Sequence, residues 1–276
     1  MICFPTCKIN LGLRITNKRA DGFHALETVF FPISIKDALE IIIEPDTNAA
    51  PISFTSSGLA INGDPSDNLC FKAYGLLKKD YPTIPNIKMH LHKTIPMGAG
   101  LGGGSADGAF TLVTLNQLFN LQLSEQALLN YALQLGSDCP FFIINTPAFA
   151  TGRGEILTPT TVDLNGYKII IVNPGIAIST KLAFSLITPK TPETNLAAVI
   201  QQPISTWKDS LINDFEQPIF NSFPELAKIK ETLYQKGAAY ASMTGTGSTI
   251  YGIFPTSMID TLSFNFPSHY FVATAS

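Results

Sequence analysis

The first 95 residues alternate short apolar runs with polar turns. Four of these runs are rich in β-branched and aromatic residues, a composition that is typical of strands. They are 7–15 (CKINLGLRI), 25–35 (ALETVFFPISI), 38–44 (ALEIIIE) and 87–93 (IKMHLHK). We therefore predict four strands in this part of the chain.

Three other stretches place apolar residues at helical spacing. Asp67 or Asn68 can cap the first of these predicted helices, and Pro82 prevents its continuation. Ser124 can cap the last one, which Gly136 ends. The three stretches are 68–81 (NLCFKAYGLLKKDY), 105–120 (SADGAFTLVTLNQLFN) and 124–136 (SEQALLNYALQLG).

Two short apolar runs follow, 140–144 (PFFII) and 147–152 (PAFATG), and we interpret both as strands. They lead to a Gly-Arg-Gly turn at 152–154, which is suited to a domain boundary. We therefore expect a first domain over residues 1–157 and a second over residues 158–276.

The second domain restarts with 167–175 (YKIIIVNPG), a predicted buried strand, followed by helical runs that prolines interrupt. Residues 238–254 (AAYASMTGTGSTIYGIF) form two strand-like runs around a glycine-rich turn. The order strand, helices, strand pair, helix, strand favours a ferredoxin-like α+β domain.

Composition and charge restrict the kinds of partner. The chain has 276 residues, 45% of them hydrophobic, and a net charge of −3, which indicates a soluble globular protein. Because no lysine- or arginine-rich block occurs, we expect a small-molecule ligand and neither nucleic acid nor a membrane. We find no secretion signal and no apolar run that could span a bilayer, so we expect a cytoplasmic protein. The oligomeric state is not predicted by the sequence.

The four cysteines form no Cys-x-x-Cys pair, and those nearest the start have no neighbouring histidine or cysteine to complete a zinc set. We interpret all four as buried reduced thiols. They are Cys3, Cys7, Cys70 and Cys139.

Residues 96–106, here named the glycine loop, open a stretch that holds six glycines within thirteen residues and runs into a predicted helix. Such a loop leaves backbone N–H groups unpaired at the positive end of the helix dipole, which makes an anion cradle. It lacks the Gly-Lys-Ser/Thr ending of a Walker loop and the glycine spacing of a dinucleotide fingerprint. A flexible turn explains one or two glycines better than six, so we favour phosphate binding.

The glycine loop resembles the phosphate loop of the GHMP kinases, which include galactokinase, homoserine kinase and mevalonate kinase. The resemblance implies an ATP-dependent kinase of α+β class with two domains and the active site in the cleft between them. The nucleotide-binding N-terminal domain has a mixed sheet with helices, and the ferredoxin-like C-terminal domain binds the substrate. The residues it assigns to the ATP phosphates are Pro96, Met97, Gly98, Ala99, Gly100, Leu101, Gly102, Gly103, Gly104, Ser105 and Ala106.

The Gly-Gly-Gly-Ser form of the loop is similar to one branch of this family, as are three further segments at 8–24, 136–142 and 242–248. This branch phosphorylates the 2-hydroxyl of 4-diphosphocytidyl-2-C-methylerythritol in the non-mevalonate route to isoprenoids. The resemblance therefore implies ATP and a cytidine diphosphate sugar alcohol as partners, with Mg²⁺ to neutralise the phosphates.

Two residues receive catalytic roles from the resemblance. Asp138 is the expected base for the hydroxyl proton, although an Asp after Gly-Ser is by itself more often a turn residue. Lys8 is its expected partner, although a lysine in an apolar strand more often extends to solvent. Asn10 shares a strand face with Lys8 and is expected to position Lys8 or the substrate.

The remaining candidates concern substrate and nucleoside. A cytosine site needs stacking aromatics and a polar group across the edge of the base, and Phe23, His24 and Phe184 fit these roles by resemblance, with core packing as the alternative. Phe23 stands where the branch usually has tyrosine. Further substrate candidates are Thr180, Gly245, Thr246 and Gly247, the last three also explained by a hairpin turn; those for base or ribose are Asn68 and Lys93.

We predict no protein ligand for the metal, because Asp107 is the one carboxylate close to the glycine loop and we expect it to face away from the loop or to cap the helix. Two alternatives to the expected reaction stay open. One is another GHMP small-molecule kinase of the homoserine or mevalonate type, which ADP release without cytidine dependence would favour. The other is a non-catalytic ATP-binding regulatory protein, which tight ATP binding without phosphoryl transfer would favour.

Overall fold

The computed structural model describes residues 1–46, 48–61, 63–192 and 194–276. By its contacts the chain divides into two compact units, each assembled from several stretches of chain. This interleaving differs from the single division after residue 157 that we expected, because long strands run from one unit into the other. Unit 1 comprises Met1–Cys7, Ile35–Met97 and Gly102–Thr146, and unit 2 comprises Lys8–Ser34, Gly98–Leu101 and Pro147–Ser276.

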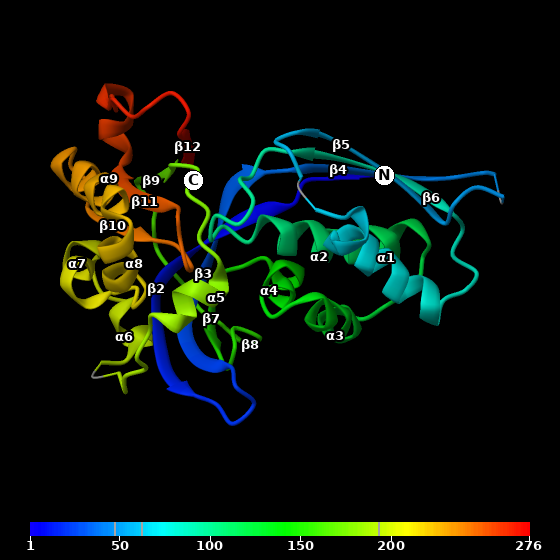
Figure 1. The fold of residues 1–276 in the computed structure, drawn as a ribbon, viewed down its shortest axis with the longest axis horizontal. Helices are drawn as coiled ribbons and strands as arrows, with labels where there is room; N and C mark the ends of the chain where they lie inside the picture. Colours follow the sequence, from blue (N-terminus) through cyan, green and yellow to red (C-terminus); the bar gives the residue numbers. More distant parts are fainter. Residues whose placement is uncertain (47, 62, 193) are drawn as a thin grey trace. The chain divides into compact units, whose positions relative to one another are not determined.

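Unit 1 combines a four-stranded sheet with helices that cover one of its faces (Figure 1). The sheet order is β1-β4-β6-β5, antiparallel except for the parallel pair β5 and β6, so the sheet is mixed as predicted. Its strands are β1 (Ile2–Cys3), β4 (Ala38–Ile43), β5 (Ile52–Gly58) and β6 (Ile87–Lys93).

The helices of unit 1 follow the predicted caps closely. The Asn68 side chain accepts the Cys70 N–H at the start of α1, Ser124 accepts the Ala127 N–H at the start of α3, and Gly136 ends α3. These predictions are confirmed. The helices are α1 (Leu69–Asp80), α2 (Gly103–Leu118), α3 (Glu125–Leu135) and α4 (Cys139–Ile144), with a 3₁₀ turn η1 (Pro65–Asp67) before α1.

The strand predicted at 140–144 is wrong, because these residues form α4. Pro140 lies in the first turn of α4, where its missing N–H costs no helical hydrogen bond. A short continuous apolar run cannot be assigned to strand or buried helix by periodicity alone. The proline was the signal that favours the helix.

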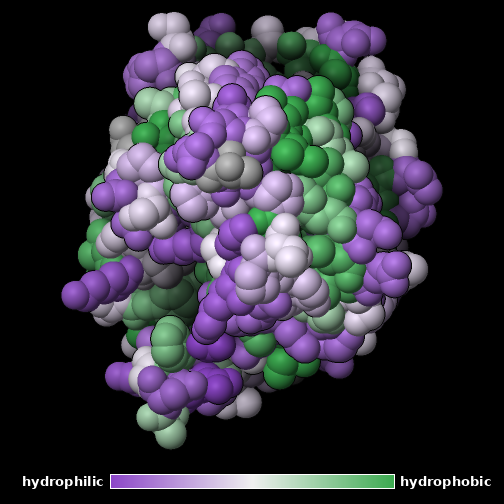
Figure 2. Space-filling view, turned by 90° about the vertical axis from the view of Figure 1, so that its right-hand side faces the viewer, coloured by the Kyte–Doolittle hydropathy of each residue, from purple (hydrophilic) through white to green (hydrophobic). Residues whose placement is uncertain are grey.

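Surface side chains of unit 1 are mixed in character. Figure 2 shows the molecule from the side on which β5, β6 and α1 lie in Figure 1, where hydrophobic side chains reach the surface between hydrophilic ones. Ile42 and Ile43, at the end of β4, are 45% and 48% exposed. Such scattered exposure is ordinary for globular proteins.

Unit 2 contains two four-stranded sheets. The first has the order β2-β3-β7-β8 and begins with two long strands; β4, β5, β6 and the helices of unit 1 lie between β3 and β7 in the chain. Most of the residues in these two strands belong to unit 2, and their ends at Thr6–Cys7 and Ile35–Lys36 belong to unit 1. The strands are β2 (Thr6–Lys18), β3 (His24–Lys36), β7 (Ala148–Thr151) and β8 (Ile156–Pro159).

The second sheet has the order β10-β11-β9-β12 with antiparallel neighbours throughout, which is the ferredoxin-like arrangement that we predicted. The last strand therefore pairs with β9. One detail differs: the connection between β11 and β12 contains the 3₁₀ helix η3 (Thr256–Thr261) where we expected an α-helix. The strands are β9 (Tyr167–Asn173), β10 (Tyr240–Met243), β11 (Ile250–Pro255) and β12 (Phe271–Ala275).

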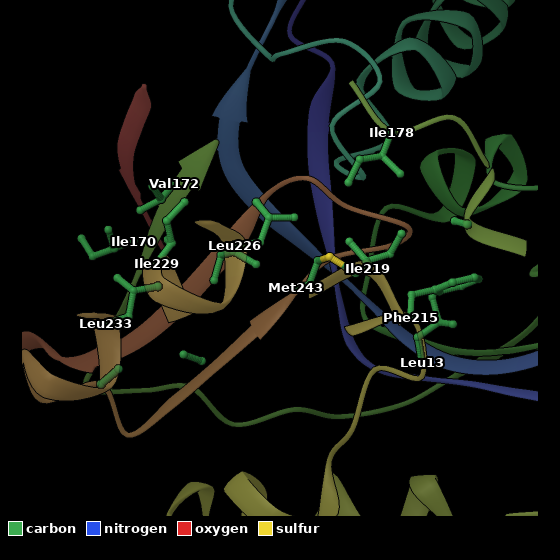
Figure 3. Close-up of a cluster of buried hydrophobic side chains, with 14 of the residues drawn as sticks. Leu13, Ile170, Val172, Ile178, Phe215, Ile219, Leu226, Ile229, Leu233 and Met243 are labelled. Carbon is green, nitrogen blue, oxygen red and sulfur yellow. The ribbon is translucent and has the colours of Figure 1, made fainter. Parts of the chain in front are cut away.

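The core of unit 2 forms where α9 (Pro224–Gln235) packs on this sheet (Figure 3). Leu226, Ile229 and Leu233 lie on one face of α9, at helical spacing, and are almost completely buried. Burial of each such side chain stabilises the fold by about 1.5–3 kcal/mol. The other helices are α5 (Thr180–Ser185), α6 (Leu196–Val199), η2 (Ile204–Thr206), α7 (Trp207–Ser210) and α8 (Glu216–Ser222).

Two further observations bear on the sequence-based expectations. Within the described ranges, no helix is long and apolar enough to cross a bilayer. All four cysteines are free; three are buried, and Cys3 is only partly buried, so for Cys3 the expected full burial is wrong.

Candidate functional site

Three alternating glycines of the glycine loop adopt a left-handed backbone conformation. Gly98, Gly100 and Gly102 have φ values of 63°, 77° and 71°, a region that glycine adopts without steric cost. Between them, Ala99 and Leu101 are buried, with exposures of 3% and 0%. The apolar side chains anchor the loop while the glycines set its path.

The loop leads directly into α2. Gly102 is the N-cap of this helix, and no side chain caps the first turn. The first helical bond runs from the Ala106 N–H to the Gly102 carbonyl at 2.9 Å, so the N–H groups of Gly103, Gly104 and Ser105 have no partner within the helix. A Cβ on Gly104 would meet no atom within 4 Å. This helix start therefore has the geometry of a phosphate site.

Lys8 is buried in β2, with an exposure of 3%, and does not extend to solvent. Its ammonium donates to Asn10 Oδ1 at 2.6 Å and to the Gly100 carbonyl at 3.0 Å. The ammonium also lies 5.1 Å from the centre of the Phe30 ring. The structure thus brings together Lys8, Asn10 and part of the glycine loop, all within unit 2.

Asn10 is itself held in one orientation. Its Nδ2 donates to Thr28 Oγ1 at 2.9 Å, and its Oδ1 accepts from Thr244 Oγ1 at 3.1 Å as well as from Lys8. The Thr244 hydroxyl is also within 3.0 Å of the Gly100 carbonyl. The prediction from the sequence omitted Thr28 and Thr244, and an apolar strand with alternating polar positions gives no sign of such long-range partners.

The second glycine turn lies against the first. A Cβ on Gly245 would come within 3.1 Å of Gly100 Cα, and a Cβ on Gly100 within 2.1 Å of the Thr244 carbonyl oxygen. Asn213, also absent from the predicted site, fixes this turn by donating to the carbonyls of Met243 and Gly245 at 2.7 and 2.9 Å. Two predicted backbone turns are therefore in direct contact.

Other predicted substrate residues lie close to this turn or start a helix. Gly247 adopts φ of 88°, and a Cβ there would come within 2.7 Å of the Met243 sulfur. Thr246 lies between the two glycines, and Thr180 is the first residue of α5, which Ser179 caps. Their contact with substrate stays a prediction.

Asp138 belongs to unit 1, where it occupies the N-cap position of α4 without capping it through its side chain. The helix α4 packs against α2. Burial raises the pKa of the Cys139 thiol to about 12, against the opposing effect of Ser105 in the first turn of α2. The segment that carries Asp138 therefore lies beside the helix start of the glycine loop. Because Lys8 belongs to unit 2, the pairing of Lys8 with Asp138 stays a prediction.

The three aromatic candidates behave differently. His24 stacks on Phe184 with ring centres 5.0 Å apart and an interplanar angle of 24°, and Phe184 meets Phe215 edge to face at 5.0 Å. Phe23 is 56% exposed. Core packing thus explains the partial burial of the Phe184 ring. It does not explain the position of the Phe23 ring, which is largely exposed.

Lys93 has surroundings that argue against its predicted contact with base or ribose. Its side chain is 1% exposed, and its ammonium bonds to Asp37 at 2.5 Å and to Asp107 at 2.6 Å. Strand alternation explains this placement, since Ile87, Met89, Leu91 and Lys93 of β6 all face inward. Asp107 faces this lysine in the interior of unit 1, and its side chain does not cap α2.

Asn68 has a structural task, since its side chain caps α1. A contact with the nucleoside stays a prediction for it. As for a metal, no group of three or more His, Cys, Asp or Glu side chains suited to ligation occurs in the part of the chain that the structure describes.

Comparison with known proteins gives matches in both parts of the chain. The model of the GHMP kinases N terminal domain matches residues 68–152, and that of the GHMP kinases C terminal domain matches residues 197–263. A 4-diphosphocytidyl-2-C-methyl-D-erythritol kinase of Bacteroides thetaiotaomicron is 51% identical over 92% of each chain. A protein of the same name from Azobacteroides pseudotrichonymphae is 48% identical over 99% of this chain and all of its own.

Solved structures agree with this fold. The crystal structure of a 4-(cytidine 5'-diphospho)-2C-methyl-D-erythritol kinase matches with a TM-score of 0.80 and 28% identity, covering 100% of this chain and 99% of that one. A homoserine kinase from Cytophaga hutchinsonii matches with a TM-score of 0.64 and 16% identity over 99% and 95% of the two chains. At that identity, the second match supports the fold alone.

Proposed function

Because the chain belongs to the 4-diphosphocytidyl-2-C-methyl-D-erythritol kinase family of the GHMP kinases, we propose that it phosphorylates the 2-hydroxyl of 4-diphosphocytidyl-2-C-methyl-D-erythritol with ATP. This reaction belongs to the methylerythritol phosphate pathway of isoprenoid precursor synthesis. The observation that carries the proposal is the buried ammonium of Lys8, held against the glycine loop by Asn10 and Gly100.

The glycine loop binds the ATP phosphates in this proposal. Three uncapped N–H groups at the start of α2 point along the helix axis, and the helix dipole adds positive potential there. Since glycines at 98 and 104 leave open space where a Cβ would stand, phosphate oxygens can approach the backbone closely. The loop thereby aligns the terminal phosphoryl group for transfer.

Lys8 and Asp138 act on the substrate hydroxyl. Asp138 accepts the proton as the oxygen attacks phosphorus, and Lys8 stabilises the negative charge that develops on that oxygen. The bonds from Lys8 to Asn10 and to Gly100 fix its ammonium before substrate arrives, which lowers the cost of reorganisation during transfer.

Phe23, His24 and Phe184 recognise the cytosine. The aromatic rings offer stacking faces, and a histidine nitrogen can bond the polar edge of the base. The stack of His24 on Phe184 opens or extends to admit the base. Gly245 and Thr246 approach the diphosphate through their backbone N–H groups, and Thr180 contributes a hydroxyl. Gly247 shapes the turn, since its N–H donates to the Thr244 carbonyl at 3.1 Å.

Mg²⁺ enters as part of the MgATP substrate. The described residues offer no set of protein ligands for the ion, and Asp107, the carboxylate closest in sequence to the glycine loop, is paired with Lys93. Coordination by phosphate oxygens and water is what Mg²⁺ prefers when bound to a nucleotide. We derive no step through the ion.

The test is ADP release by the purified protein with MgATP and four acceptors. These are the diphosphocytidyl substrate, the same sugar phosphate without its cytidylyl group, homoserine and mevalonate. Release that depends on the cytidylyl group supports the proposal. Release with homoserine or mevalonate would indicate a different GHMP kinase, and ATP binding without any release would indicate a regulatory nucleotide-binding protein.

A further inference from the structure

Phe23 stands out among the candidate cytosine contacts because packing does not orient its ring, which is 56% exposed. Its backbone is well defined. The Arg19 N–H donates to the Phe23 carbonyl at 2.8 Å, and the Phe23 N–H donates to Asp21 Oδ1 at 3.1 Å. The turn between β2 and β3 is therefore ordered, and the remaining freedom is that of the phenylalanine side chain.

The guanidinium of Arg153 lies over this ring, with its central carbon 5.1 Å from the ring centre. Arg153 comes from the turn between β7 and β8, which is adjacent because β7 pairs with β3. The Leu26 N–H, at the start of β3, donates to the Gly152 carbonyl at 2.8 Å, which ties β3 to the turn that carries Arg153. A guanidinium at this distance attracts the π-face of an aromatic ring.

Two carboxylates, those of Glu155 and Asp21, lie near Arg153, but neither forms a hydrogen bond with its Nε. Its backbone N–H donates to Glu155 Oε2 at 2.5 Å, and its Nε lies 3.5 Å from Glu155 Oε1 without making a hydrogen bond. Asp21 faces the same group: its bond to Arg19, and further the positive charge of Arg153, lower the pKa of the Asp21 carboxyl. The side chain is thus placed by charge, and its guanidinium lies over the Phe23 ring.

We propose that Arg153 is a positioning residue for the base platform of the substrate: it covers one face of Phe23 and presents the opposite face to the cytosine. This inference rests on the proposed function, which it deepens. A phenylalanine has no hydrogen-bonding group through which the protein could orient its ring. The guanidinium supplies that orientation, so that guanidinium, ring and base form three layers.

The experiment is a double-mutant cycle with Arg153→Met and Phe23→Leu, read as kcat and KM for the diphosphocytidyl substrate and for ATP. We expect Arg153→Met to raise KM for the diphosphocytidyl substrate about two- to fivefold, the range for an exposed cation–π contact, with kcat and KM for ATP unchanged. In the Phe23→Leu background the same substitution has no further effect. Arg153→Lys, which keeps the charge, recovers part of the loss.

A matched control exists in the same unit. Lys208 lies 5.0 Å from the centre of the Tyr234 ring, a similar contact far along the chain, and Lys208→Met should leave both KM values unchanged. The four cycle variants are also unfolded in urea. Without any ligand, Arg153→Met should lower the unfolding midpoint in the wild-type background and less in the Phe23→Leu background.

Three results would overturn the inference. One is an unchanged KM in Arg153→Met, and another is the absence of coupling in urea. The third is an equal rise of KM in both backgrounds, because Arg153 would then act on the substrate directly and not through Phe23. A wild-type protein that turns over ATP but never with a cytidylyl acceptor would instead overturn the proposed function, and the base platform with it.

Discussion

The ammonium of Lys93 donates to Asp107 Oδ2 at 2.6 Å, and both side chains are buried. Lys93 ends β6 and Asp107 lies in the second turn of α2, so the bond joins the sheet of unit 1 to the helix that follows the glycine loop. Asp37 shares the ammonium and also accepts the N–H groups of Thr94 and Ile95 at 2.6 and 2.9 Å. This triad of side chains thereby anchors α2, the helix at whose start we propose that phosphate binds.

Removal of the ammonium should therefore destabilise unit 1 strongly. In Lys93→Met the two carboxylates stay buried without their counter-charge, and breaking a buried pair in this way costs about 3–5 kcal/mol. Urea denaturation measures the loss in free energy of unfolding. Lys88→Met is the matched control, since Lys88 lies on the same strand but its side chain is 51% exposed beside Glu44, and it should unfold close to wild type. Equal stability of the two variants would contradict the structural role of the triad.

The titration of Asp107 should make the free energy of unfolding depend on pH. Burial raises the pKa of this carboxyl from 3.8 to about 7, with Asp37 adding to the rise and Lys93 opposing it. A carboxyl with a raised pKa holds its proton more tightly in the folded state, so its contribution to stability is complete below about pH 4 and is lost as the pH rises to about 7.

The free energy of unfolding is measured at intervals from pH 4 to pH 8 for wild type and Asp107→Asn. We expect the free energy of unfolding of the wild type to fall with rising pH over this range by a component that the asparagine variant lacks. Parallel curves for the two proteins would show that Asp107 does not titrate there.

Two glycines of the loop should respond to alanine in opposite ways. Gly100→Ala places a Cβ within 2.1 Å of the Thr244 carbonyl at a φ of 77°, so we expect a lower melting temperature. Gly104→Ala adds a methyl in open space within a helix, which should leave the melting temperature equal or raise it.

Gly104→Ala also tests phosphate binding. If the loop cradles phosphate, Gly104→Ala should still raise KM for ATP about tenfold or more, since its methyl occupies the space of a phosphate oxygen. Unchanged KM for ATP in a stable Gly104→Ala protein would argue against this position of the phosphates.

Asp138→Asn tests the proposed base. The amide cannot accept the hydroxyl proton, and loss of general base catalysis typically lowers kcat about 10²- to 10⁴-fold. ATP affinity, measured by calorimetry, should change little, because the phosphate groups bind to the loop backbone. Turnover near the wild-type rate would make Asp138 a structural residue at the start of α4.

Local signals in the sequence predict the local parts of this fold well. The helix ends at Asn68, Ser124 and Gly136 could be predicted because the hydrogen bonds of a cap join residues only a few positions apart in the sequence. The prediction for residues 140–144 was wrong because a short apolar run fits both a strand and a buried helix. Most of the residues assigned to the site came from resemblance and not from periodicity.

The partners of the site residues were beyond prediction. Thr244 bonds to Asn10 across 234 positions of the sequence, and Asn213 reaches Gly245 across 32. Such contacts depend on how sheets and helices pack, which no local pattern records. Lys93 shows the same limit. We assigned it to the nucleoside, whereas the inward-facing positions of β6 bury its ammonium beside Asp37 and Asp107.

The interleaved course of the chain limits what can be exchanged or expressed in isolation. Leu13 and Ile15, from β2, belong to the same buried cluster as Val172, Phe215 and Leu226. A fragment that begins at residue 158 holds every strand of the ferredoxin-like sheet, but it lacks Leu13 and Ile15 and therefore has an incomplete core. A chimera of two relatives joined at this point would combine core residues from both parents, so we expect it to be less stable than either.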